Sequence, residues 1–147
     1  MRSRRAWRAG TVSYRMLFMD RSEPLSEADR ELIRGIALRV KDENAREEAL
    51  VARRLQSAKA EALALARRLA ADPQVRRVLF FGSAATGRDF RLDSDIDLAV
   101  EGGDILFHRA TTERSAFSVD VVDIPALPVP LRKAIEMEGE ILFEKHE

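Results

Sequence analysis

The sequence has 147 residues, of which 46% are hydrophobic and 34% are charged, and it contains no cysteine. This length suits one compact domain with its own core and is too short for two. The lack of cysteine excludes disulfides and thiolate metal ligands and fits a reducing cytosol. No apolar stretch is long enough to cross a bilayer, so we expect a soluble, cytoplasmic protein that does not contact membranes.

The first 19 residues form a basic segment. They carry five arginines and no acidic residue, whereas the rest of the chain has 20 basic and 25 acidic residues, a net charge of −5. The segment lacks the apolar stretch of a secretory signal, so we do not expect export. We favour reading residues 1–20 as a disordered tail or as an extension upstream of the true start. An arm that binds nucleic acid through Trp7 and Tyr14 ranks last, and nucleic acid is not an expected partner.

The segment 21–73 is predicted to be helical. Ser26, with Asp29 three positions later, is typical of a helix N-terminus. Apolar residues at helical spacing continue from there to Val40. The polar run at residues 41–44 then either breaks this helix or forms a solvated turn.

A second helix is predicted from about Ala45 to Ala71. Its apolar residues recur every three or four positions, and Asp72-Pro73 ends it. We interpret this second helix as an amphipathic cover for a sheet. For the first helix, a plain cover and a surface that binds a partner are equally favoured.

The remaining residues, 74–147, contain the stretch whose residue types require chemistry. Val78–Phe81 is short, wholly apolar and followed by glycine, which is typical of a strand buried on both faces. Gly82 can hold a strained turn and let a ligand approach the backbone, while Ser83 offers a hydroxyl and an amide. This corner therefore suits a phosphate group.

A second strand is predicted over Asp95–Val100, after a polar loop. In a strand, Asp95 and Asp97 point to one face, about 6.7 Å apart along the backbone, and Ile96 faces the core. Two like charges at this spacing are unfavourable unless a cation lies between them, and Mg²⁺ is the obvious candidate. Asp93 has the same spacing but precedes the strand composition, so we place it in the loop.

The chain ends with a third strand, a helix and a last short strand. Phe117–Ile124 is strongly β in composition, and residues 104–116 before it are predicted to form a short, irregular helix. Pro130 suits the first turn of the following helix, which Gly139 caps. Ile141–Phe143 is the last strand.

The order of these features resembles the nucleotidyltransferase superfamily that includes DNA polymerase β. The combined motif is a strand ending in Gly82-Ser83 and a second strand carrying Asp95 and Asp97, and it is closest to the minimal nucleotidyltransferases of bacteria and archaea. The resemblance covers Val75–Phe143. Eleven residues separate the serine from the first aspartate, one more than the commonest spacing in the family. The resemblance implies an α/β (α+β) fold with a small mixed sheet and helices, preceded here by the N-terminal helical segment.

The resemblance also implies an active site. The superfamily usually supplies a third carboxylate from a neighbouring strand, and the matching position here is Asp120. The expected catalytic residues and ligands of one or two Mg²⁺ ions are Asp95, Asp97 and Asp120. Gly82 and Ser83 are expected to hold the phosphates of a nucleoside triphosphate, ATP, and Arg88 to spread their charge.

A function follows from the same resemblance. It implies a nucleotidyltransferase that moves AMP from ATP to a hydroxyl of a partner protein. In the minimal family this partner is typically a helical HEPN-domain protein, and the pair behaves as toxin and antitoxin with the transferase as antitoxin. The alternative is a binding module of the same fold that neutralises its partner by contact alone.

Overall fold

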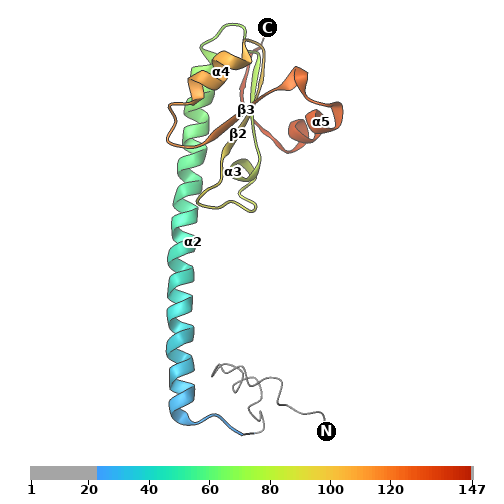
Figure 1. Cartoon of the computed structure of the whole chain (residues 1–147). Helices are drawn as coiled ribbons and strands as arrows, with labels where there is room; N and C mark the ends of the chain where they lie inside the picture. The colour runs from blue at the N-terminus through green and yellow to red at the C-terminus, as the bar shows by residue number, and fades with distance from the viewer. Residues whose placement is uncertain (1–22, 147) are drawn as a thin grey trace, which may run out of the picture. The chain divides into compact units, whose positions relative to one another are not determined.

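The structure is a computed structural model in which residues 23–146 are described (Figure 1). The basic segment predicted at residues 1–20 lies outside the described residues. The chain divides into two compact units, residues 1–43 and 44–147, and each is taken by itself below. In chain order the elements are α2 (Glu27–Ala70), β1 (Arg77–Phe81), α3 (Ser83–Thr86), β2 (Ile96–Glu101), α4 (Ile105–Thr112), β3 (Val119–Asp123), the 3₁₀ turn η2 (Ile124–Ala126), α5 (Val129–Glu138) and β4 (Glu140–Glu144).

The described part of the first unit is dominated by the N-terminal half of α2. The backbone N–H of Asp29 donates to Ser26 Oγ at 3.1 Å, and the N–H of Ser26 donates to Asp29 Oδ2 at 3.2 Å. This reciprocal pair satisfies backbone donors that the first helical turn leaves free, which confirms the predicted N-terminus. The apolar side chains that follow are exposed, including Leu32 and Ile36.

α2 is one continuous helix, and the prediction of a separate helix starting at Ala45 is wrong. The helix runs through the polar run at residues 41–44, whose side chains are all exposed. Lys, Asp, Glu and Asn each cost at most about 0.7 kcal/mol relative to alanine inside a helix, so a solvated polar run does not break one. Although α2 has 44 residues, no helix in the described range is long and apolar enough to cross a membrane.

The second unit is built on a four-stranded sheet with the order β3-β2-β1-β4. β1 pairs antiparallel with β2 and β4, whereas β2 pairs parallel with β3. A parallel pair needs a crossover connection, and α4 supplies it. The predicted small mixed sheet with helices is confirmed, and β3 and β4 are its two edges.

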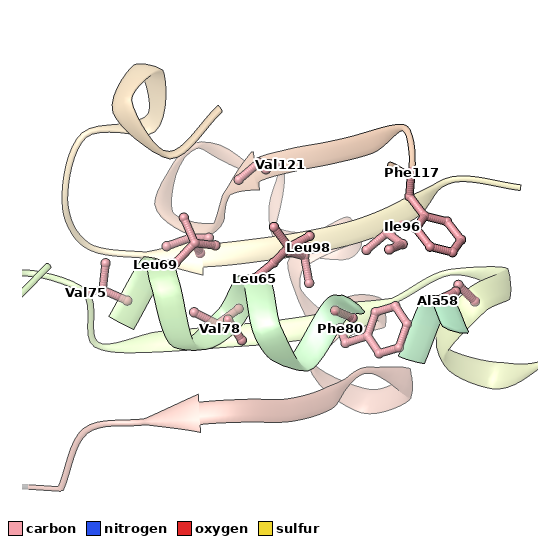
Figure 2. Packing of buried hydrophobic residues seen from close by; sticks show 14 of the residues in the cluster. Ala58, Leu65, Leu69, Val75, Val78, Phe80, Ile96, Leu98, Phe117 and Val121 are labelled. Carbon is pink, nitrogen blue, oxygen red and sulfur yellow. The ribbon is translucent and has the colours of Figure 1, made fainter. Parts of the chain in front are cut away.

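The C-terminal half of α2 covers one face of this sheet. Figure 2 shows Leu65 and Leu69 of α2 directed toward the strands that carry Val78 and Leu98. All four side chains are at least 98% buried, and burying a leucine or valine contributes about 1.5–3 kcal/mol. This packing confirms that residues 45–71 form an amphipathic cover.

A second, smaller cluster lies on the opposite face of the sheet. Leu79 and Ala99 pack there against Ile124 of η2 and Ile135 of α5. Successive side chains of a strand point to opposite faces of the sheet. Strand residues that are next in sequence to members of the first cluster therefore point to this second face. Asp97 and Asp120 of the predicted site are among them.

Candidate active site

Three neighbouring strands bring Phe81, Asp97 and Asp120 into one row across the sheet. Phe81 of β1 is the register partner of Asp97 on β2, and Asp97 is the register partner of Asp120 on β3. Register partners point to the same face. This row lies on the face covered by η2 and α5, because it alternates with buried residues such as Ile96 and Val121 that face α2.

The carboxylates of Asp95, Asp97 and Asp120 interact electrostatically. The pKa of Asp97 is raised from its ordinary value of 3.8 to about 6, first by burial of its carboxyl and then by the negative charges of Asp120 and Asp95. Asp97 is half-buried, whereas Asp120 is exposed at the edge of the sheet. β2 begins at Ile96, one residue later than predicted, so Asp95 directly precedes the strand and is not part of it. Asp95 and Asp120 are therefore near enough to oppose the ionisation of Asp97.

This donor set fits a hard divalent cation. It offers only carboxylate oxygens, which are the ligands that Mg²⁺ uses in proteins, and a cation would relieve the repulsion that raises the pKa of Asp97. Within residues 23–146, no group of three His, Cys, Asp or Glu side chains already stands in a metal-holding arrangement. The residues present would thus have to draw together around the ion.

The corner between β1 and α3 lies directly against Asp97. Gly82 has φ +80° and ψ −168°, a conformation that is essentially restricted to glycine. A Cβ built on Gly82 would overlap Asp97 Oδ2 and come within 3.1 Å of Asp97 Cγ. The Gly82 carbonyl accepts from the N–H groups of Ala85 and Thr86 at 3.2 and 3.1 Å, so α3 starts from this corner, with half-buried Ser83 as its first residue.

Arg88 follows α3 in an exposed turn. Gly87, at φ +75°, caps α3, and the backbone N–H of Arg88 donates to Thr86 Oγ1 at 3.1 Å. Among the described residues, no hydrogen bond or ion pair joins the Arg88 side chain to the carboxylates, so its role toward a triphosphate stays a prediction. Asp93 lies in the loop before β2, as expected, and is exposed.

A cavity of about 730 Å³ opens beside Asp97 and Asp120. It is lined by consecutive residues of β3, by one side of α4 and by apolar residues of α5. Arg109 of α4 and Glu113, which directly follows α4, are the other charged residues in its wall. Neither residue was predicted from the sequence to lie near the site. Their spacing of four positions is common at the surface of helices and does not mark a binding site.

The sequence matches one known family. Residues 64–147, more than half of the chain, match the family described as polymerase beta, nucleotidyltransferase. This range contains every strand of the sheet and the last turns of α2. No curated protein matches the chain.

Several solved structures are similar to the chain over part of its length. A toxin-antitoxin crystal structure with AMP-PNP has 25% sequence identity and a TM-score of 0.43, covering 50% of this chain and 64% of that one. A toxin-antitoxin MntA-HepT structure has 21% identity and a TM-score of 0.43, covering 61% and 73%. A Shewanella oneidensis tri-AMPylated HEPN toxin in complex with MNT antitoxin has 21% identity and a TM-score of 0.43, covering 62% and 73%. The chain thus spans slightly less than two thirds of the first of these chains.

Proposed function

The chain belongs to the polymerase β nucleotidyltransferase family, and from this membership we propose that it is a Mg²⁺-dependent enzyme that transfers AMP from ATP to a hydroxyl group of a partner protein. The observation that carries the proposal is the register of Asp97 with Asp120, beside the corner at Gly82. Acidic side chains aligned beside such a corner support the proposal that a cation and a triphosphate bind there.

In the proposed reaction the acceptor oxygen attacks the α-phosphorus of ATP. The bond from that phosphorus to the bridging oxygen of pyrophosphate breaks, pyrophosphate leaves, and the hydroxyl proton passes to a carboxylate or to solvent. Asp95, Asp97 and Asp120 would hold Mg²⁺. When bound, the ion supplies positive charge that stabilises the triphosphate and the attacking oxygen.

The backbone at the β1–α3 corner would position the leaving group. Gly82 leaves room for an approaching phosphate on its exposed side, and Ser83 offers a hydroxyl and an amide. Arg88 would neutralise part of the triphosphate charge from the adjacent turn. These roles follow the motif that the chain shares with the minimal nucleotidyltransferases.

We propose a HEPN-type helical protein as the acceptor, with this chain as the antitoxin of the pair in the cytoplasm. The motif Gly82-Ser83 with Asp95 and Asp97 supports this assignment through its similarity to the minimal members of the family. The test is to incubate the full chain with α-³²P-labelled ATP, MgCl₂ and the protein product of the adjacent gene. Label on that protein is expected with the native chain and not with Asp95→Asn. Absence of label with the native chain, or undiminished label with the variant, would refute transfer.

A second candidate is neutralisation of the same partner by contact alone. It is favoured by the finding that, in the described range, no three acidic or imidazole side chains are already arranged around a metal position. The double change Asp95→Asn and Asp97→Asn separates the two candidates. Neutralisation of toxicity that survives the double change supports contact, whereas its loss together with the label supports transfer.

A further inference from the structure

The strand β3 has one paired edge and one free edge. Ser118 C=O accepts from the N–H of Ile96 at 2.9 Å, and in a parallel ladder the backbone groups of alternate residues turn to the same neighbour. The backbone of Asp120 therefore faces β2, and the backbones of Val119 and Val121 face outward. Because β3 is the end of the sheet order, these outward groups have no neighbouring strand in the part of the chain that the structure describes.

The outward groups of β3 remain largely unused in the free chain. Across residues 23–146, no backbone hydrogen bond is found for the N–H or C=O of Val119. Val121 C=O accepts from Arg109 Nε at 3.3 Å, which confirms that it points away from β2. Unpaired strand edges of this kind are templates for another extended chain.

The cavity beside the carboxylates follows this free edge. Ser118 to Val122 line it without interruption, although their side chains alternate between the two faces of the sheet. Only a hollow that runs along the edge itself can contact all five. Residues of α4 and of α5 also line it, so these two helices bound the hollow along β3.

We propose that the free edge of β3 binds an extended segment of the acceptor protein, which adds to the sheet as a fifth strand. This inference rests on the proposed function and names how its acceptor is recognised. The row of Phe81, Asp97 and Asp120 would continue into the segment, because residues in register point to one face and adjacent strands lie about 4.8 Å apart. The segment residue in register with Asp120 would carry the hydroxyl that receives AMP.

This docking mode places the two substrates on opposite sides of the carboxylates. The corner at Gly82 and Ser83 adjoins β1 at one end of the row, and the added segment adjoins β3 at the other end. An attacking oxygen and a leaving group must be roughly in line across the phosphorus. The sheet order therefore suits attack from the β3 edge on a triphosphate held at the β1 end.

The walls of the cavity predict the side chains of the segment. On the face of Asp120 they are apolar, with Leu127, Leu131 and Ile135, and Leu131 is 47% exposed. Residues two positions apart in a strand share a face. The segment should therefore carry an apolar side chain two positions from its hydroxyl residue.

Amide hydrogen exchange on the full chain tests the docking directly. Adding the HEPN-type partner is expected to slow exchange at the amides of Val119 and Val121 by at least about tenfold, because outward amides would become hydrogen-bonded. The amides of Asp120 and Val122 face β2 in the free chain and serve as internal controls. AMP-PNP alone should not produce the effect at the outward amides.

Amide exchange and transfer of labelled AMP, measured together, distinguish failure of this inference from failure of the proposed function. Protection without transfer of label supports docking and refutes transfer, whereas label without protection at Val119 and Val121 overturns docking and leaves transfer intact. Protection by AMP-PNP alone, or by raising the concentration of the chain alone, assigns the edge to nucleotide or to a second copy and overturns the inference. Absence of any protection also overturns it.

A pair of surface variants gives a second readout. Leu131→Lys puts a charge on the apolar wall of the cavity. It is expected to raise the KM for the partner protein in the labelling assay by about tenfold or more, since an apolar contact of about 1.4 kcal/mol is lost. Leu106→Lys is the matched control, because Leu106 is 69% exposed on α4 and does not line the cavity. Equal KM values for the two variants would contradict the proposed wall contact.

Discussion

Gly82 packs against the carboxylate of Asp97 so closely that no side chain fits between them. Gly82 directly follows β1 and Asp97 lies in β2, and the register of these strands places Asp97 opposite Phe81, the residue before Gly82. The glycine thereby determines where the half-buried carboxylate can lie. A change at this position should disturb the site more than the fold.

Replacement of Gly82 by alanine is expected to lower the free energy of unfolding by about 1–3 kcal/mol, because its backbone conformation is essentially restricted to glycine. It should also abolish labelling of the partner, because the new methyl group displaces the Asp97 carboxylate. Urea unfolding and the labelling assay measure the two effects. The control is Gly35→Ala, because a Cβ at Gly35 would meet no atom within 4 Å. This change lies within α2 and should raise the free energy of unfolding by about 0.5–1 kcal/mol. Full labelling by Gly82→Ala would contradict the expectation.

The raised pKa of Asp97 predicts a pH-dependent stability in the absence of divalent cations. In the folded chain Asp97 holds its proton up to a pH of about 6, whereas its ordinary pKa is 3.8. The folded state therefore binds more protons between these values, so the stability from neutral Asp97 is fully present below pH 3.8 and is lost as pH rises through 6. Asp97→Asn should raise the Tm in EDTA at pH 7.5 and give little gain near pH 4.

The control for this measurement is Asp93→Asn, which alters an exposed carboxylate in the neighbouring loop. Its Tm difference from the native chain should be small and similar at both pH values. An equal gain from Asp97→Asn at pH 4 and pH 7.5 would show that the effect is not protonation of Asp97.

Addition of MgCl₂ is expected to raise the Tm of the native chain at pH 7.5. An ion that binds only the folded state at a hundred times its Kd adds about 2.7 kcal/mol of stability, and Mg²⁺ would also relieve repulsion among the carboxylates. Thermal melts of the native chain, Asp120→Asn and Asp93→Asn measure the shift, with KCl at matched ionic strength to account for screening. The shift should vanish in Asp120→Asn and persist in Asp93→Asn. A comparable shift with KCl would argue against a bound ion.

The packing of α2 on the sheet should dominate the stability of the second unit. Leu65 is fully buried, so Leu65→Ala is expected to cost about 2–5 kcal/mol through lost burial and the cavity left behind. Leu63→Ala, two positions earlier and 38% exposed, should cost much less. Urea unfolding followed by circular dichroism compares the two variants. Similar losses for both would mean that the α2 contact contributes little.

Local patterns in the sequence were sufficient for most elements. The apolar run ending at Gly82 and the alternation around Asp97 predicted β1 and β2, because both patterns reflect contacts made within a few residues. The second helix predicted from Ala45 was wrong, since helix propensities differ too little over residues 41–44 to reveal that α2 continues through them. Sequence propensity also extended β3 to Phe117–Ile124, beyond the residues that the sheet actually pairs.

The arrangement of the site depended on long-range pairing that local patterns do not contain. The residue types of Asp95, Asp97 and Asp120 indicated carboxylate chemistry, but the register that aligns Asp97 with Asp120 arises only when α4 returns the chain parallel to β2. For the same reason, nothing in the sequence marked Arg109 as a neighbour of β3. Such contacts join residues that are distant in sequence.

The sheet separates its main cover from its acidic row, since α2 packs on one face and Asp97 and Asp120 point to the other. Substitutions that repack α2 against β1 and β2 can therefore raise or lower thermal resistance without touching the reacting groups. If the β3 edge binds the acceptor as proposed, this independence would let acceptor preference change at that edge while compensating mutations accumulate beneath α2. It also makes the α2 face the natural place to begin if the chain is to be engineered for use at higher temperature.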